Sequence, residues 1–186
     1  MVATIDVINE LRTKYNAKYV YYLAYLNGII VKIPLTDFAK IYEIAKEPYV
    51  GKIHNGMLPL EVKDYNGPLN YGITGVGVNS RLLNNVGITG EGVRVGVIDT
   101  GVNHTDLIHK IAAFQNISDG IDDNDDPIED RDMHGTHVAG IIHQIAPNAS
   151  LYVASIETSV PLTQIFNTAE FALALEWLLR NRNSAS

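Results

Sequence analysis

Apolar residues recur at helical spacing at the start of the chain, at Ile5, Ile8, Leu11 and Tyr15. A period of three to four residues predicts an amphipathic helix whose apolar face packs on a core. The next stretch, KYVYYLAYL over residues 18–26, is rich in tyrosine and aliphatic side chains and favours a strand. The chain is therefore expected to open with a helix followed by a strand.

The dipeptide Asn27-Gly28 separates that strand from a second apolar run, IIVKI. Asn-Gly between two such runs predicts a β-hairpin, because both residues tolerate a positive φ. A second helix is expected after Thr36, a residue suited to capping. Its apolar face comprises Phe38, Ile41, Tyr42 and Ala45. With a short strand predicted for YVGKI at 49–53, the order matches a small α+β, ferredoxin-like domain that lacks its first strand.

Buried strands and helices alternate in the second half of the chain. GVRVGVID at 92–99 and ASLYVASI at 149–156 are Val/Ile-rich runs typical of buried parallel strands. DMHGTHVAGII at 132–142 predicts a helix between them, and residues 163–180 predict the longest helix. The expected apolar face of that last helix comprises Phe166, Ala169, Leu173 and Trp177. This alternation predicts an α/β layer with a parallel sheet, and the Gly-, Asn- and Pro-rich residues 56–88 between the two halves predict a linker.

Composition narrows the classes of function. The chain has 186 residues, a formal net charge of −7 and no cysteine. Disulfides, thiol catalysis and thiolate metal sites are thereby excluded, and the negative charge argues against nucleic acid or an anionic membrane as the main partner. We expect no membrane span, since no run of about 18 apolar residues occurs, and no signal peptide is visible. The oligomeric state is left open.

Asp99 stands at the end of a predicted strand. In parallel α/β sheets, functional sites form beyond the carboxyl ends of the strands, and Gly101 allows the chain to turn sharply there. Asp99 is therefore a candidate site residue. The alternative is an aspartate that only caps a turn.

His134 opens the predicted helix, with Gly135 beside it. A carboxylate that accepts Nδ1–H would fix the tautomer of such a histidine and leave Nε2 free as a general base. Gly135 would allow a substrate backbone to approach closely. The alternative is a histidine whose hydrogen bonds are satisfied inside the core.

His137 lies three residues further on, which raises the alternative of a zinc-binding pair. Metalloprotease helices space their histidines four apart, with a glutamate between them. Here the intervening Gly135 and Thr136 offer no general base. We therefore expect His137 to be a packed structural residue.

The segments VRVGVIDTGV and DMHGTHVAGII closely resemble the aspartate and histidine signatures of subtilisin-like serine proteases, in the same order and separated by an acidic loop. The resemblance implies serine-type endopeptidase activity on protein and peptide substrates, without a catalytic cofactor. It implies that Asp99 orients the histidine and that His134 is the general base. It also implies secretion.

The same resemblance divides the chain. Residues 1–62 look like the family's propeptide domain with its linker, an intramolecular chaperone and inhibitor that binds its own catalytic domain. Residues 63–186 look like the N-terminal part of the catalytic domain, a doubly wound parallel sheet.

The chain departs from the family in its nucleophile. The family's serine lies about 150 residues beyond the histidine, whereas this sequence ends at Ser186, and the oxyanion-hole asparagine is likewise absent. We therefore expect a fragment, truncated before the nucleophile, that carries only Asp99 and His134 and is inactive alone. The turn NHTDL after Asp99 is about two residues shorter than the family's usual version, so we expect the local geometry around Asp106 to differ from the family's.

The alternative function is an inactive homologue that binds and inhibits a protease.

Two other segments suggest ligands. The acidic loop DDNDDPIED offers clustered oxygen atoms that suit calcium, with Asp123, Asp125 and Asp126 as candidate ligands of a structural Ca²⁺. The alternative is a solvated acidic loop. The glycines of GITGVGVNSRLL suggest dinucleotide binding within a nucleotide-binding α/β protein, but no strand precedes them, as that motif requires.

Overall fold

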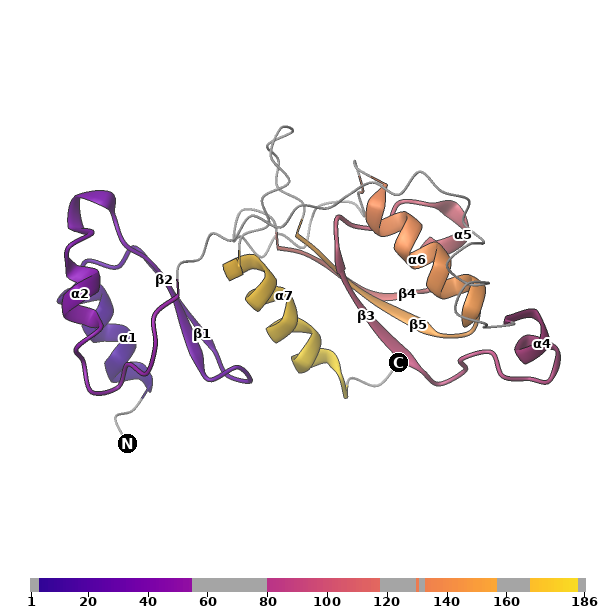
Figure 1. Cartoon of the computed structure of the whole chain (residues 1–186), viewed down its shortest axis with the longest axis horizontal. Helices are drawn as coiled ribbons and strands as arrows, with labels where there is room; N and C mark the ends of the chain where they lie inside the picture. Colours follow the sequence, from indigo (N-terminus) through magenta and orange to yellow (C-terminus); the bar gives the residue numbers. More distant parts are fainter. Residues whose placement is uncertain (1–3, 55–79, 118–129, 131–132, 157–167, 184–186) are drawn as a thin grey trace. The chain divides into compact units, whose positions relative to one another are not determined.

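The computed structural model describes residues 4–54, 80–117, 130, 133–156 and 168–183. The chain divides into two compact units, Met1–Gly56 and Met57–Ser186, and each unit is described by itself (Figure 1). The boundary expected from the sequence, between residues 62 and 63, lies outside the described residues.

The described part of the first unit packs short helical segments against a β-hairpin. Its elements are α1 (Thr4–Thr13), β1 (Tyr19–Leu23), β2 (Gly28–Lys32), the 3₁₀ helix η1 (Leu35–Asp37) and α2 (Lys40–Ile44). Strands β1 and β2 pair antiparallel, with Tyr19 opposite Lys32. A small core lies between these elements, and its buried side chains are Val7, Leu11, Tyr15, Ala17 and Ile44.

The predicted hairpin is confirmed, but several details differ. Residues 24–27 form its loop, so that Asn27, at a φ of 50°, ends the loop and Gly28 already belongs to β2. Residues 49–53 form no strand, which leaves two strands in the described sheet of this unit. The ferredoxin-like arrangement is therefore not confirmed.

The predicted second helix begins as a 3₁₀ turn that contains Thr36, so Thr36 is not its cap. A 3₁₀ turn has three residues per turn, which shifts the phase of the helix that follows. As a result Ile44 is buried, whereas Phe38 and Tyr42 are 55% and 68% exposed.

A cluster of polar side chains joins the end of α1 to the segment after α2. The hydroxyl of the buried Tyr15 donates a hydrogen bond to Glu47. The Lys14 ammonium lies 2.5 Å from the same carboxylate oxygen and 3.1 Å from Glu10. Hydrogen bonds from Lys14 and then from Tyr15 lower the pKa of Glu47.

The second unit is an α/β layer. Its elements are α4 (Ser80–Asn85), β3 (Arg94–Asp99), α5 (Thr105–Ile108), β4 (Ile111–Asn116), α6 (His134–Ile145), β5 (Ser150–Ser155) and α7 (Thr168–Asn181). The three strands form a parallel sheet in the order β3-β5-β4. The parallel α/β class predicted from the alternating strands and helices is confirmed.

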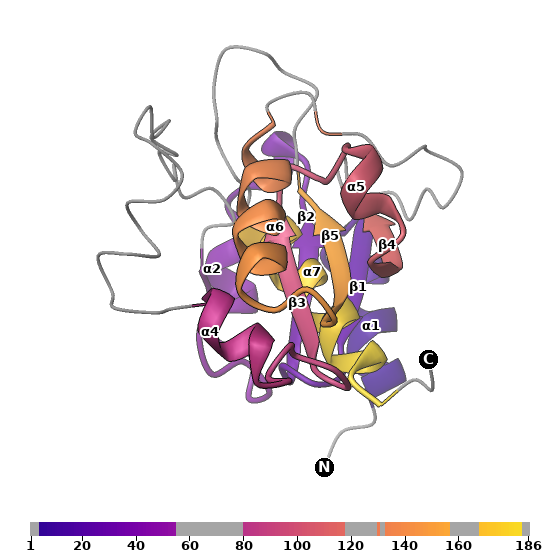
Figure 2. The ribbon, with the colours of Figure 1, turned by 90° about the vertical axis from the view of Figure 1, so that its right-hand side faces the viewer.

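Helices cover both faces of this sheet, as the two views of the ribbon show (Figure 1, Figure 2). On one face, Val97 and Val153 pack with Ala139 of α6. On the other, Ala154 packs with Ala174 of α7. The side chains of successive strand residues point to opposite faces, so one strand supplies both cores. The sheet is thereby held at a fixed distance from α6, which positions the start of that helix.

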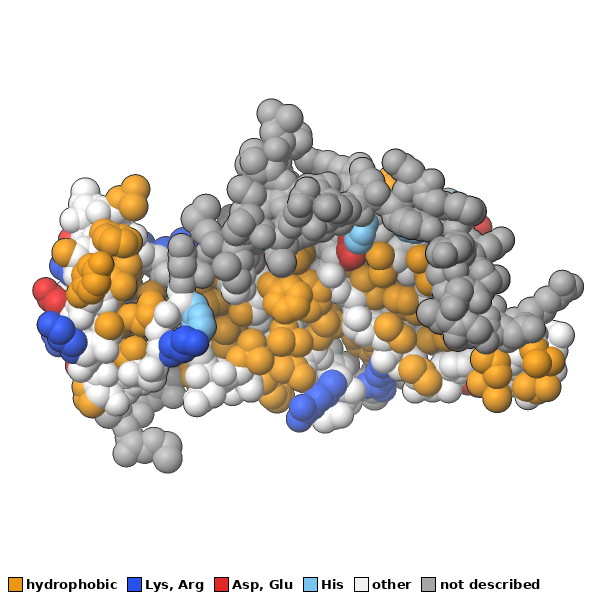
Figure 3. Space-filling model, in the orientation of Figure 1, with side chains coloured by type: hydrophobic (Ala, Val, Ile, Leu, Met, Phe, Trp, Pro, Cys, Tyr) orange, Lys and Arg blue, Asp and Glu red, His pale blue; other side chains and the backbone are white. Residues whose placement is uncertain are grey.

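Hydrophobic side chains also gather at the surface over α7 (Figure 3). Phe171 on this helix is 42% exposed. Among the helices that the structure describes, none combines the length and apolar character needed to cross a membrane.

We predict that the first unit loses stability in acid through Glu47. Its pKa is lowered from 4.5 in the folded state, so its stabilising effect is complete above about that pH and is lost as the pH falls through the lower folded-state value. Hydrogen exchange of the α1 amides in the whole chain, corrected for the intrinsic rate, is expected to show protection that declines below about pH 4.5.

Two variants control this measurement. In Glu47→Gln, α1 is expected to be less protected at neutral pH and to show a weaker decline in acid. Glu43→Gln alters an exposed carboxylate of α2 and is expected to behave as the wild type. A decline in Glu47→Gln as steep as that of the wild type would contradict this role for Glu47.

Candidate active site

Asp99 is the last residue of β3 and lies beside Ser155, the last residue of the neighbouring β5. The Ile156 amide donates a hydrogen bond to the Asp99 carbonyl at 2.9 Å, which holds the two strand ends together. Gly101 then has a φ of 128°, a conformation that side chains rarely adopt. The chain therefore turns away directly after Asp99, at the carboxyl edge where sites form in parallel sheets.

His134 is the first residue of α6, and its ring meets the Asp99 carboxylate. The distance from His134 Nδ1 to Asp99 Oδ1 is 2.7 Å. The side chains are 27% and 14% exposed, so the pair is shielded without being sealed from solvent. The Thr100 amide also donates to Asp99 Oδ1, at 2.8 Å, which fixes the carboxylate. With Nδ1–H donating to Asp99, Nε2 is the ring nitrogen that can accept a proton.

Gly135 allows α6 to approach the turn after β3. A Cβ atom at this position would lie 2.1 Å from the Gly101 carbonyl oxygen and 3.1 Å from Asp99 Oδ1. No side chain fits there without backbone movement. The backbone that comes close to Gly135 in the structure is that of Gly101, whereas the expected approach of a substrate backbone stays a prediction.

A buried carboxylate, Asp130, lies at the start of α6 and is 4% exposed. Its Oδ1 accepts hydrogen bonds from the Met133 amide and the Thr100 hydroxyl, both at 2.8 Å. Its Oδ2 accepts from the amide of Thr136 at 2.7 Å and from the hydroxyl of the same residue. The Thr100 hydroxyl in turn accepts from the Gly135 amide at 2.9 Å. These contacts join the end of β3 to the first turn of α6.

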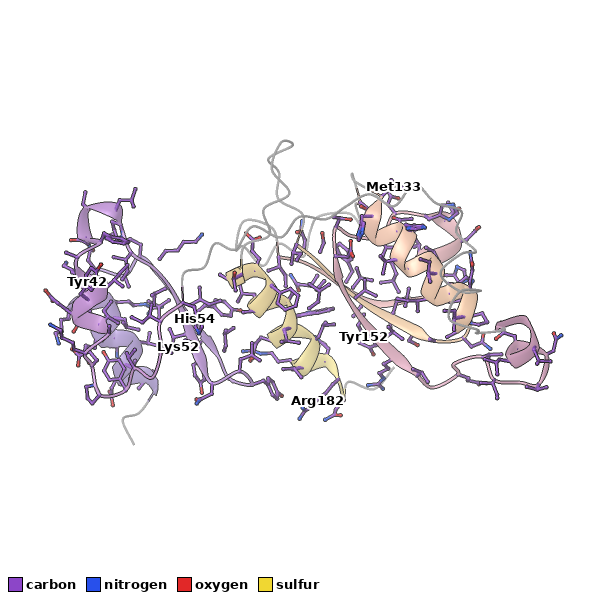
Figure 4. The ribbon with its side chains drawn as sticks, viewed as in Figure 1. Tyr42, Lys52, His54, Met133, Tyr152 and Arg182 are labelled. Atoms are coloured by element: carbon purple, nitrogen blue, oxygen red, sulfur yellow. The ribbon has the colours of Figure 1, made fainter. Side chains whose placement is uncertain are left out.

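Met133 connects Asp130 to His134 and adopts a left-handed conformation, with a φ of 64°. Figure 4 labels Met133 at the beginning of α6, where its side chain is 48% exposed. It is the N-cap residue of the helix but has no side-chain cap hydrogen bond. The Asp130 carboxylate occupies that capping position instead.

Other polar residues lie apart from the Asp99–His134 contact. His137 is half-buried one turn into α6, and its amide donates to the Met133 carbonyl as in any helix. Asp106 has an 83% exposed side chain, and its amide donates to His104 Nδ1 at 3.2 Å. Ser155 is buried and donates its hydroxyl hydrogen to the Thr100 carbonyl at 3.0 Å. The structure therefore brings together Asp99 and His134, the two residues proposed for catalysis, and His137, Asp106 and Ser155 take no part in their contact.

The proposed calcium ligands Asp123, Asp125 and Asp126 lie outside the described residues, so this hypothesis stays a prediction. Within the described ranges, no group of three or more acidic or histidine side chains is arranged to hold a metal ion.

Three residues at the site were missed from the sequence: Thr100, Asp130 and Thr136. A signal for Asp130 was present, because an aspartate shortly before a helix is a preferred partner for the free amides of its first turn. Several acidic residues precede this helix, and their spacing alone does not show which of them is the partner.

Comparison with known proteins agrees with this geometry. Residues 90–181 match the Subtilase family. Subtilisin E from Bacillus subtilis (strain 168) is 29% identical over 184 residues, a match that covers 91% of this chain and 44% of that protein. The subtilisin-like protease PopC from Myxococcus xanthus (strain DK1622) is 36% identical over 104 residues, with 50% and 22% covered. The major intracellular serine protease of Bacillus subtilis (strain 168) is 31% identical over 101 residues, with 53% and 32% covered.

The segment that matches the Subtilase family, residues 90–181, contains β3, α6 and α7. The chain spans less than half the length of each of these three relatives.

Two glycines of α6 give a matched test of the close approach. Gly135→Ala is expected to destabilise the second unit by about 3 kcal/mol, because overpacking against backbone atoms is relieved only by moving the helix. A Cβ on Gly140 would meet nothing within 4 Å, so Gly140→Ala is expected to stabilise by about 1 kcal/mol through helix propensity. Urea unfolding monitored by Trp177, the single tryptophan, measures both. Equal stability of the two variants would contradict the packing described here.

Proposed function

We propose that this chain supplies the general base and its orienting carboxylate to a serine-type endopeptidase. The observation that carries the proposal is the 2.7 Å contact between His134 Nδ1 and Asp99 Oδ1, formed where a parallel strand ends and a helix begins. The match of residues 90–181 to the Subtilase family and the similarity to proteins named as subtilisins and serine proteases support it.

In the proposed reaction, a serine hydroxyl attacks the peptide carbonyl carbon while His134 Nε2 takes its proton. His134 then returns that proton to the leaving amine as the carbon–nitrogen bond breaks. Water releases the acyl group by the same two proton transfers. Asp99 keeps the ring in the required tautomer and stabilises the imidazolium that forms twice in each cycle.

The described serines of β5 do not suit the nucleophile. Ser155 is buried, and its hydroxyl already donates to the Thr100 carbonyl. Ser150 lies at the opposite end of the strand, paired with Arg94. The proposal therefore assigns the nucleophile to a serine outside the described residues.

The first unit is proposed to be an inhibitory and chaperoning propeptide. Two observations support this: residues 1–56 form a separate compact unit, and the similarity to subtilisin E covers 91% of the chain and therefore extends into that unit. If this is right, the chain should inhibit an active subtilisin at a concentration ratio near one to one. The same assay detects the alternative function, an inhibitor without activity of its own.

Secretion is also a proposal and follows only from the family resemblance. One similar protein is named as intracellular, so the family does not by itself fix the compartment.

We predict that casein hydrolysis by the protein, expressed from its native reading frame, depends on the Asp99–His134 pair. Asp99→Asn and His134→Ala are each expected to lower kcat by about 10⁴-fold, because the base is lost or held in the wrong tautomer. His137→Asn is the control and is expected to keep activity within a few-fold, since the contact between His134 Nδ1 and Asp99 Oδ1 does not involve His137.

Initial rates at several casein concentrations give kcat and KM for each variant. Equal loss of activity in His137→Asn and His134→Ala would contradict the assignment of His134 as the general base. An inactive wild-type protein that nevertheless inhibits an active subtilisin would favour the alternative function.

A further inference from the structure

We propose that Asp130 is a positioning residue for His134, acting through Thr100 and Thr136. It does not touch the ring. It fixes the first turn of α6, on which His134 stands, against the end of β3, which carries Asp99. This inference rests on the proposed function, because it assigns Asp130 a task in the same reaction.

The Asp130 carboxylate caps the first turn of α6. The first amides of an α-helix lack partners within the helix and need acceptors from elsewhere. Met133, the N-cap residue, provides no side-chain acceptor. Asp130 accepts from the amides of Met133 and Thr136 at 2.8 and 2.7 Å. These amides lie on either side of His134 in the sequence, so one carboxylate holds the turn that contains it.

Thr100 and Thr136 link this cap to the end of β3 and the residues that follow it. The Thr100 hydroxyl donates to Asp130 at 2.8 Å and accepts from the Gly135 amide at 2.9 Å. The Thr100 amide donates to Asp99 Oδ1 at 2.8 Å. A single residue thus contacts Asp130, the helix and the catalytic carboxylate. Thr136 makes a second link, because its hydroxyl donates to Asp130 and accepts from the Asn103 amide at 2.9 Å.

The backbone of Met133, directly before His134, is strained. A non-glycine residue is strained in the left-handed region, and the φ of Met133 is 64°. Backbone strain of this kind persists only where the surrounding structure enforces it. The hydrogen bond from the Met133 amide to the buried Asp130 carboxylate supplies that enforcement directly before His134.

Loss of the Asp130 carboxylate is expected to affect the first turn of α6 and not the rest of the unit. Without the Asp130 carboxylate, the first turn of α6 loses its cap and its link to Thr100, while the sheet and the remainder of the helix keep their packing. His134 then samples positions in which Nδ1 is no longer held at Asp99. A displacement of about 1 Å at a catalytic group costs about 10²-fold in rate.

The test observes the pair directly, in the 186-residue chain. The Nδ1–H proton of His134 gives a separate downfield ¹H NMR signal when it is held by Asp99, and Asp99→Asn identifies it by its loss. In Asp130→Asn we expect this signal to disappear or broaden while the methyl signals of the folded core persist. In the hydrolysis assay the same variant is expected to lower kcat by about 10²-fold with KM unchanged, because Asp130 is buried beneath the first turn of α6 and is not exposed for substrate contact.

Further variants separate positioning from general stability. Thr100→Val removes the hydroxyl that links Asp130 to α6 and is expected to lose the signal, whereas Thr100→Ser retains the hydroxyl and is expected to keep it. Glu176→Gln alters a buried carboxylate of α7, on the other face of the sheet, and is expected to leave the signal in place. If Asp130→Asn does not fold, the two Thr100 variants decide the question.

The outcomes distinguish two failures. If the wild-type chain shows no such signal, then the Asp99–His134 pair is not formed, and both the proposed function and the role of Asp130 are contradicted. If the wild type shows the signal and folded Asp130→Asn and Thr100→Val retain it unchanged, only the role of Asp130 is overturned.

Discussion

The contact between Asp99 and His134 requires the end of a strand and the start of a helix to meet at hydrogen-bonding distance, 2.7 Å. Much of the local sequence follows from that constraint. Gly101 turns the chain away from β3 with a φ of 128°. Gly135 lacks the Cβ atom that would lie 2.1 Å from the Gly101 carbonyl oxygen. Gly101 and Gly135 thus have different tasks, a turn and a close approach, and both serve to bring the His134 ring to the Asp99 carboxylate.

The electrostatic potential at the start of α6 disfavours a positive charge on His134 unless nearby negative charges compensate it. The positive end of the α6 dipole disfavours the imidazolium that a general base must become. Two carboxylates lie at the same helix end, Asp99 against the ring and Asp130 beneath the first turn. A buried charge such as Asp130 is tolerated only when hydrogen bonds replace its hydration, and its two oxygens accept from Thr100, Met133 and Thr136. Asp130 therefore holds the first turn of α6 and, together with Asp99, offsets the positive potential at the start of that helix.

The sequence predicted those features that depend on local pattern. The parallel strands β3 and β5 and the helices α6 and α7 were predicted, because their apolar runs are long and regular. Strand β4 was not predicted, since its IAAFQN has no clear alternation and its pairing with β5 is irregular between Ile111 and Ala113. The face of the second helix was wrong because a 3₁₀ turn precedes it. The partners of Asp130 were missed because they come from residues up to 30 positions away, which no local pattern reveals.

The central claim is that Asp99 holds His134 as the Nδ1–H tautomer, with Nε2 ready to accept a proton. The most direct test is the pair of ¹⁵N chemical shifts of the His134 ring, measured in the 186-residue chain at a pH where the ring is neutral. The account predicts a protonated Nδ1 and an unprotonated Nε2, a pattern that Asp99→Asn abolishes. A ring that is mainly protonated at Nε2, or whose tautomer is unaffected by Asp99→Asn, would contradict it.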